Sequence, residues 1–208
     1  VGHHLSTIEG GMVCTDDDEV YEMARMLRSH GMVREADSQA IRARHEEQNP
    51  DLNPKFIFAY ASGNFRSTEI NAVIGRSQLP HLDENNEKRR RHFEVFLSHL
   101  DGDRYQVDFA AEGSVNYAFV LILRRPDVAL RDAVMRIMDQ HGVEYRRGTS
   151  GGGNQLRQPY LKGIVPEGAW RSVPRVDHVH FYGFYIGNYP SLTEADIVSL
   201  CGLLNGAS

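Results

Sequence analysis

Two adjacent histidines near the start of the sequence are the residues best suited to proton transfer. His3 and His4 lead into a short alternating segment that ends in Glu9 and a Gly-Gly pair. Imidazole titrates near pH 7 and can act as a general acid or base. Because glycines permit a tight turn and residues 12–14 are extended again, the pattern predicts a hairpin with the histidines at one end. The alternative is an exposed His-His pair at a frayed terminus, or a remnant of a purification tag.

A pair of arginines beside a glycine-rich loop is a candidate anion site. Arg146 and Arg147 precede residues 148–153, four of which are glycines. A guanidinium matches the geometry of a phosphate, and glycine-rich backbone can present N–H groups to one. The loop has neither the Walker nor the dinucleotide spacing. Its alternative interpretation is a mobile loop.

Three further polar residues stand at predicted helix ends. His30 and Arg34 follow a helix and could contact an anion or a sugar hydroxyl. The imidazole could equally interact with the negative end of the helix dipole. Asn64 precedes another helix, where either Asn64 or Ser67 could be the cap. An amide beside a helix N-terminus also suits a phosphate.

The ten histidines of the sequence do not form a recognisable metal-binding motif. His178 and His180 would share one face of a strand, but there is no third ligand at a telling distance and no CxxC. We therefore predict no metal site. Cys14 and Cys201 stand in apolar company and are expected to be reduced core residues of a cytosolic protein.

Hydrophobic periodicity predicts the elements that position these groups. We expect helices over residues 15–31, 66–100 and 127–140 and from residue 193, and strands over residues 115–123, 143–146 and 181–186. Thr15 is the expected first cap, Gly31 the stop, and Pro80 should kink or split the long helical segment. Residues 32–63 read as an irregular polar loop, and the basic residues 88–91 as a solvated helix face. The alternation after residue 105 predicts a small α/β sandwich.

The composition bounds the class of protein. The chain has 208 residues, 41% hydrophobic and 25% charged, with a net charge of −5. This charge argues against a general nucleic-acid binder, and no apolar run approaches a membrane span. With no signal-peptide pattern, we expect a cytoplasmic protein without nucleic-acid or membrane partners. The sequence starts with Val inside a strand-like pattern, so we also expect a fragment whose N-terminal half is absent.

Several blocks of sequence resemble the DegT/DnrJ/EryC1/StrS sugar aminotransferases, which are fold-type I enzymes dependent on pyridoxal phosphate (PLP). Residues 3–13 resemble the block around the cofactor lysine, where the family has Lys, a few residues and Thr-x-Glu-Gly-Gly. Residues 63–75 look like the family's Gly-Tyr-Asn-Tyr-Arg-Met-x-Glu-x-x-Ala-x-x-Gly block. Residues 190–194 resemble its closing segment. The match runs over nearly the whole chain, and the first two blocks together are specific.

The resemblance implies an α/β chain with an α+β small domain. This would be the C-terminal domain of a fold-type I PLP-dependent transferase, a short sheet flanked by helices, with the last strands of the large domain at the N-terminus. Residues 1–65 would end the large PLP-binding domain and form the active-site loop, residues 66–100 would be a long connecting helix, and residues 101–208 the small α/β domain. The family's cofactor-ring aspartate, stacking aromatic and phosphate-binding turn lie upstream of the His3 position. We therefore expect that this chain does not hold the cofactor alone.

His3 stands where the family has its Schiff-base lysine, and imidazole cannot form that bond. The resemblance is to a branch with histidine there, the colitose-type sugar 3-dehydratases of deoxysugar and lipopolysaccharide O-antigen biosynthesis, which act with pyridoxamine phosphate (PMP). It implies that His3 is the base that takes a proton from the cofactor's C4′ carbon while a nucleotide-linked 4-keto-6-deoxy sugar loses its C3 hydroxyl. Some members of the branch hold a [2Fe–2S] cluster through cysteines in the region of residues 30–63. That region has no cysteine here, so we expect no iron–sulfur cluster.

The resemblance also implies binding roles. Asn64 would reach the cofactor phosphate of the neighbouring subunit, making the active unit a homodimer, and glutamate would be the amino donor. His30, Arg34 and Arg146 would bind the sugar or its diphosphate, with Arg146 preferred over Arg147 because it aligns with the branch's strand-end arginine. Two alternatives stay open: a PLP-dependent nucleotide-sugar aminotransferase of the same family, or a non-catalytic dimerisation or ligand-binding fragment.

Overall fold

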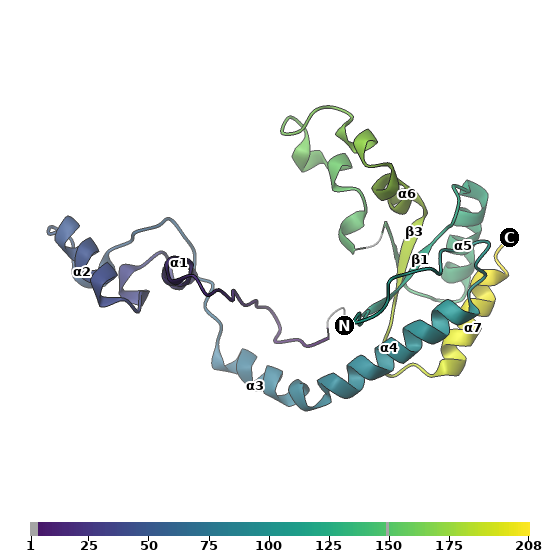
Figure 1. Ribbon diagram of the computed structural model, residues 1–208, viewed down its shortest axis with the longest axis horizontal. Coiled ribbons are helices and arrows are strands. Elements are labelled where there is room, and N and C mark those ends of the chain that lie inside the picture. Colours follow the sequence, from purple (N-terminus) through teal and green to yellow (C-terminus); the bar gives the residue numbers. More distant parts are fainter. Residues whose placement is uncertain (1–3, 149) are drawn as a thin grey trace. The chain divides into compact units, whose positions relative to one another are not determined.

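The computed structural model describes residues 4–148 and 150–208, which form two compact units (Figure 1). The N-terminal unit is Leu5–Leu79, and the C-terminal unit comprises His4 with Pro80–Ser208. The helix predicted over residues 66–100 is two helices separated by a 3-10 turn at Leu79–His81, as expected from the proline within it. The division of the chain into three functional segments stays a prediction.

The N-terminal unit contains three helices, α1 (Asp18–Arg28), α2 (Gln39–Gln48) and α3 (Glu69–Gln78). Asp17 caps α1, because its carboxylate accepts the amide protons of Glu19 and Val20. The prediction of Thr15 as the cap is wrong. Thr15 lies three residues before the helix begins, and its hydroxyl instead accepts the amide proton of Asp17 at 3.1 Å.

Helix α2 lies within the segment expected to be irregular. Ser38 caps it by accepting the amide proton of Ile41 at 3.3 Å. None of its residues is buried, so its sequence carries no apolar stripe that periodicity could detect. The small core of this unit comes mostly from other segments, with Met26, Val33, Ala36 and Ile57 buried together.

The predicted N-terminal hairpin is wrong for the described residues. Residues 4–14 contain no strand, so the expected last strands of a large domain are not found there. The segment is held instead by side chains of α3: Asn71 Nδ2 donates to the Thr7 carbonyl at 2.5 Å, and Gln78 exchanges two hydrogen bonds with the Ser6 backbone. These contacts take up backbone groups that a strand partner would have used.

The C-terminal unit is built on a three-stranded antiparallel sheet in the order β1-β3-β2. Its strands are β1 (Ala118–Ile122), β2 (Tyr145–Arg147) and β3 (Gly183–Gly187), and its helices are α4 (Leu82–His99), α5 (Val128–Gln140), α6 (Pro174–Tyr182) and α7 (Glu194–Asn205). Helix α7 packs against α4 and α5 (Figure 1). Phe96 of α4 stacks on Phe119 of β1 with ring centroids 4.6 Å apart, and both are fully buried. A short sheet flanked by helices is therefore what this unit forms.

One local prediction for the C-terminal unit is corrected. His178 and His180 lie in α6 rather than on a strand, because β3 begins only at Gly183. An i, i+2 pair on a helix does not share a face. His178 Nε2 instead lies 2.6 Å from the Leu123 carbonyl oxygen, and no three His, Cys, Asp or Glu residues among those described could hold a metal ion together.

The two cysteines differ in environment. Cys201 is buried, and burial raises the pKa of its thiol to about 12. Cys14 is exposed, so the prediction of a core position is wrong for it.

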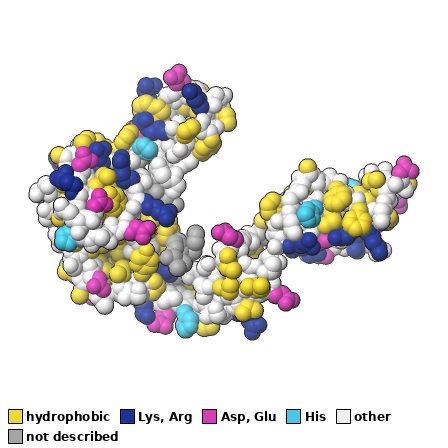
Figure 2. Space-filling model, turned by 180° about the vertical axis from the view of Figure 1, so that it is seen from behind, with side chains coloured by type: hydrophobic (Ala, Val, Ile, Leu, Met, Phe, Trp, Pro, Cys, Tyr) yellow, Lys and Arg dark blue, Asp and Glu magenta, His cyan; other side chains and the backbone are white. Residues whose placement is uncertain are grey.

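Several large apolar side chains remain on the surface. Met12, Val13, Phe65, Ile70 and Val73 of the N-terminal unit are exposed. Figure 2 shows apolar side chains interspersed with charged ones on the face in view. None of the helices in the described ranges is long and apolar enough to cross a membrane.

Candidate functional site

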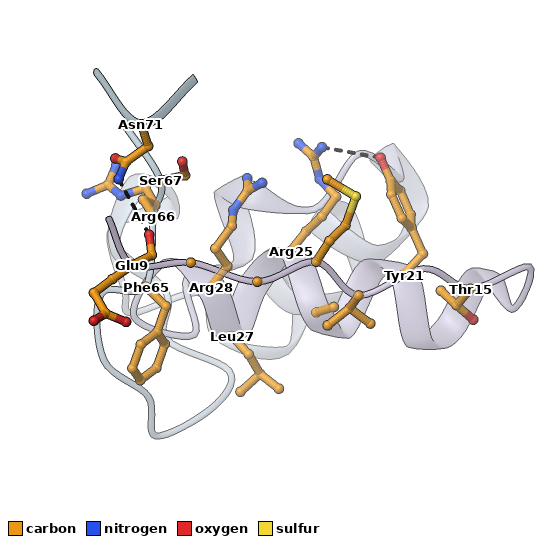
Figure 3. Close-up of a pocket in the computed structure, with 15 residues that line it drawn as sticks. Glu9, Thr15, Tyr21, Arg25, Leu27, Arg28, Phe65, Arg66, Ser67 and Asn71 are labelled. Carbon is orange, nitrogen blue, oxygen red and sulfur yellow. Dashed lines mark hydrogen bonds between the residues drawn. The ribbon is translucent and has the colours of Figure 1, made fainter. Parts of the chain in front are cut away.

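A groove of about 1210 Å³ in the N-terminal unit lies along one side of α1. Its walls come from three segments, the extended residues 9–15, helix α1 and residues 65–71 (Figure 3). Arg25 and Arg28 project to the same side of the helix in Figure 3, whereas Leu27 projects to the opposite side. The groove therefore combines apolar surface with guanidinium groups.

Three arginines line this groove, and only Arg25 forms an ion pair with a residue that the structure describes. Arg25 is fixed by Asp37, whose carboxylate lies 2.9 Å from Nη2, and by the Glu35 carbonyl, which accepts from Nε. Arg28 makes no ion pair with any residue that the structure describes, and Arg66 only donates from Nε to Asn64. Neither Arg28 nor Arg66 was predicted as a site residue, although Arg66 stands within residues 63–75, one of the blocks that carry the family resemblance.

His30 and Asn64 are brought together by backbone hydrogen bonds at the end of α1. The His30 amide donates to the Gly63 carbonyl at 2.8 Å, and the Phe65 amide donates to the Arg28 carbonyl at 2.8 Å. Ser29 and Asn64 form an isolated antiparallel bridge. Two candidates that are 34 positions apart in sequence (64 minus 30) thus occupy one corner of the N-terminal unit.

The backbone of His30 is in the left-handed region, with φ of 60°. This conformation is uncommon for a residue with a side chain. Gly31 follows with φ of 73°, and its amide donates to the Met26 carbonyl at 2.8 Å, closing the helix end. The chain therefore turns sharply at His30, and its imidazole is half-buried beyond the helix.

Arg34 follows in a 3-10 helix over Val33–Glu35. Its guanidinium lies over the ring of Phe56, 5.3 Å from the centroid, and its Nε is 3.5 Å from a Glu35 carboxylate oxygen. With a side chain 42% exposed, Arg34 remains accessible to an anion.

Asn64 is exposed and does not cap the following helix. Its Oδ1 accepts from the Arg66 amide at 3.1 Å and from Arg66 Nε at 3.2 Å, while Nδ2 donates to no other residue in the described ranges. Thr68 caps α3 through a capping box with Asn71, so the cap prediction for Asn64 or Ser67 is wrong. The Asn64 amide group is consequently available as a donor.

Arg146 lies in the C-terminal unit, on edge strand β2. It is exposed, and its guanidinium carbon lies 5.7 Å from the ring centroid of Tyr185 on β3. Tyr185 was not predicted as a site residue. The alternation of the β3 sequence could have found it, because a tyrosine beside a core phenylalanine must face the other side of the sheet.

The segment that follows Arg146 is tied to α6. Asn154 is almost fully buried. Its backbone N–H donates to His180 Nδ1, and its side-chain Nδ2 donates to Asp177. Arg157 binds the same carboxylate through Nε and Nη2, at 2.5 and 2.8 Å, and holds the pKa of Asp177 below its ordinary value. Hydrogen bonds to α6 therefore fix the segment that directly follows the glycine-rich loop.

His3, the predicted catalytic base, lies outside the described residues. His4, the next residue in the chain, is half-buried in the C-terminal unit. Its ring meets Tyr117 edge-on, with centroids 6.4 Å apart.

A family model and several known proteins match the chain over most of its length. The model of the DegT/DnrJ/EryC1/StrS aminotransferase family matches residues 2–202. The chain is 26% identical over 207 residues to the GDP-4-keto-6-deoxy-D-mannose 3-dehydratase of Yersinia pseudotuberculosis, covering 97% of this chain and 51% of that protein. The chain thus spans about half the length of this relative.

Solved structures of a similar enzyme share the fold. GDP-4-keto-6-deoxymannose-3-dehydratase with a trapped PLP-glutamate geminal diamine matches with a TM-score of 0.73 at 23% identity, over 98% of this chain and 52% of that one. A mutant of GDP-4-keto-6-deoxymannose-3-dehydratase with bound GDP-perosamine matches with a TM-score of 0.70 at 22% identity, over 91% and 49%. The similarity confirms the predicted fold class, which is the fold of part of the fold-type I PLP-dependent enzymes. The chain belongs to the DegT/DnrJ/EryC1/StrS aminotransferase family.

Proposed function

We propose that the chain is the C-terminal part of a cytoplasmic nucleotide-sugar 3-dehydratase, a lyase that removes the C3 hydroxyl from a nucleotide-linked 4-keto-6-deoxyhexose. The observation that carries this proposal is the match of 97% of the chain to a GDP-4-keto-6-deoxy-D-mannose 3-dehydratase. The histidine at position 3, where the family resemblance places a lysine, supports the same assignment. Glutamate is the proposed amino donor.

The proposed cofactor is PMP, interconverted with PLP. When bound, it supplies an amine that condenses with the C4 ketone and a ring that withdraws electrons from the adjacent carbon. Asn64 fits its phosphate, because the Nδ2 donor is not used by the described residues while Oδ1 is held by Arg66. We propose that this contact is made to the neighbouring subunit's cofactor, so that the active unit is a homodimer.

His3 is the proposed base. Its imidazole would take a proton from the cofactor's C4′ carbon and deliver it to the oxygen that leaves C3, and this transfer needs a group that titrates near neutral pH. A lysine amine in this position would also attack the cofactor aldehyde as a nucleophile. An imidazole would not form that bond. His3 thus keeps acid–base chemistry without a covalent tether.

His30, Arg34 and Arg146 are the proposed contacts of the sugar or its diphosphate. Arg34 and Arg146 are accessible guanidinium groups, each lying over an aromatic ring, and guanidinium donors suit phosphate oxygens. His30 stands beside the Asn64 corner and offers an imidazole to a hydroxyl or phosphate. Arg34 and Arg146 would each offer positive charge to an anionic nucleotide.

The test is product analysis with the complete open reading frame. The protein is incubated with PLP, glutamate and a panel of GDP-, CDP- and dTDP-linked 4-keto-6-deoxy sugars. The proposal predicts a product without oxygen at C3. An amino sugar with the C3 oxygen retained would rule the dehydratase out.

An aminotransferase is the second candidate, because the matching family is described as one. It predicts amino transfer from glutamate to the 4-keto sugar with no deoxygenation. A non-catalytic dimerisation or ligand-binding fragment is the third, since the chain spans about half of its relative. It predicts dimers in analytical ultracentrifugation and no turnover of any sugar on the panel.

A further inference from the structure

The two adjacent arginines of β2 occupy opposite faces of the sheet. Arg146 is paired in register with Tyr185, and Arg147 with Phe184. Phe184 is fully buried in the core. Since directly paired residues share a face and neighbours alternate, Arg147 belongs to the core side, while Arg146 and Tyr185 share the other side.

Arg146 is held by an aromatic ring rather than by a carboxylate. Its guanidinium carbon lies over the Tyr185 ring, 5.7 Å from the centroid. Within the described ranges no Asp or Glu forms an ion pair with Arg146. A guanidinium stacked on a ring keeps its positive charge and its in-plane N–H donors for a ligand, whereas a carboxylate partner would use both.

The supporting ring is itself restrained. Tyr185 is half-buried on the central strand, and the ring of Tyr117 meets it edge-on, with centroids 6.1 Å apart and planes at 76°. Tyr117 in turn meets His4 edge-on. The ring that supports Arg146 therefore belongs to a row of aromatic contacts from Tyr185 through Tyr117 to His4, the residue next to the proposed base.

We propose that Tyr185 is a positioning residue that holds the Arg146 guanidinium ready for the diphosphate of the nucleotide sugar. The proposal rests on the proposed function for the identity of the ligand. It depends on the ring and not on the hydroxyl, so Tyr185→Phe retains the support and Tyr185→Leu removes it. Arg147→Gln is the matched control, because that arginine lies on the opposite face of the same strand.

The support is tested without any turnover by NMR of the Arg146 Nε–Hε group in the ¹⁵N-labelled chain, assigned by its loss in Arg146→Gln. We expect a restrained, ring-shifted signal in the unsubstituted chain and in Tyr185→Phe, and a mobile signal at the ordinary shift in Tyr185→Leu. An Arg146 signal that is the same in Tyr185→Leu overturns the proposal.

The consequence for binding is tested by calorimetric titration of GDP into the complete protein, in a double-mutant cycle. Tyr185→Leu should weaken binding by about two- to fivefold when Arg146 is present, and leave it unchanged in an Arg146→Gln background. Tyr185→Phe and Arg147→Gln should bind as the unsubstituted protein does. Equal losses in both backgrounds, or no loss in either, contradict the proposal.

The two proposals fail separately. If the NMR and binding results hold but no sugar on the panel is dehydrated, the dehydratase assignment is refuted and the positioning role of Tyr185 stands. If dehydration is observed but Tyr185→Leu leaves the Arg146 signal and GDP binding unchanged, only the positioning role is refuted.

Discussion

At the scale of single residues, the corner that presents His30 depends on a glycine that nothing can replace without strain. Gly31 has a positive φ, and a Cβ built there would collide with the backbone carbonyl of Tyr60. The sequence identifies Gly31 as a helix stop, but the close approach of residue 60 is a tertiary contact that the sequence does not reveal. The position of His30 is therefore set by its neighbour's lack of a side chain.

Gly31→Ala should destabilise the chain by about 2–3 kcal/mol, because it adds a backbone collision to an unfavourable φ. Gly113→Ala is the control. That glycine has the same φ of 73° but no atom within 4 Å of an added Cβ, so it should lose only about 1 kcal/mol. Urea unfolding measures both, and equal losses would show that the contact with Tyr60 does not matter.

The ion pair behind the glycine-rich loop predicts a pH dependence. The hydrogen bonds from Arg157 hold the pKa of Asp177 below its ordinary value of 3.8. A depressed carboxyl pKa contributes stability above the unfolded-state pKa, and this contribution is lost as the pH falls through the folded-state value.

We therefore expect the urea midpoint of the unsubstituted chain to fall, relative to that of Asp177→Asn, as the pH is lowered below about 4. Above about pH 5 the difference between the two midpoints should be constant and in favour of Asp177. Parallel curves from pH 7 to pH 3 would contradict the role assigned to this carboxylate.

At the scale of elements, one buried asparagine after β3 joins α4 to the segment that precedes β1. Asn188, which follows β3, donates from Nδ2 to the carbonyls of Arg89 and Asn116, both at 2.9 Å. Its Oδ1 lies 3.1 Å from His92 Nδ1, and Arg89 Nε donates to its backbone carbonyl. Arg89 is buried, so the prediction that residues 88–91 form a solvated face is wrong for Arg89, whereas the other three residues are exposed.

Asn188→Ala should cost about 2–4 kcal/mol in the free energy of unfolding, because two backbone carbonyls and His92 lose a hydrogen-bond partner. Asn188→Asp should be at least as destabilising, since a carboxylate cannot donate to the two carbonyls. If Asn188→Asp is tolerated in urea unfolding, the donor role of this side chain is refuted.

Elements with local start signals were predictable, and those defined by distant partners were not. Helices α5 and α7 begin after Asp127 and Thr193, whose caps are written in the adjacent sequence. Helix α2 buries no side chain, so it left no periodic pattern. The same limit applies to the candidate site. Its residues could be predicted by their type, but the proximity of His30 to Asn64 depends on a hydrogen bond between His30 and Gly63, which are 33 positions apart.

At the scale of the whole molecule, the candidate residues are divided between the two units. His30, Arg34 and Asn64 belong to the N-terminal unit, whereas Arg146 and His4 belong to the C-terminal unit. A family match over residues 2–202 covers both units. The residues proposed for the reaction therefore come from both units, and the proposed base is His3, which stands where the resemblance places the family's lysine.

The most direct test of this account compares the complete protein with its His3→Lys variant on the same nucleotide-linked 4-keto-6-deoxy sugar, with glutamate and PLP. The proton NMR spectrum of the product reports a methylene at C3 if the hydroxyl has left. We predict a 3-deoxy product from the unsubstituted protein and a loss of dehydration of about 10²-fold or more in His3→Lys, the usual contribution of a general base. Dehydration at an unchanged rate in His3→Lys, or an amino sugar with its C3 oxygen from the unsubstituted protein, would contradict the account.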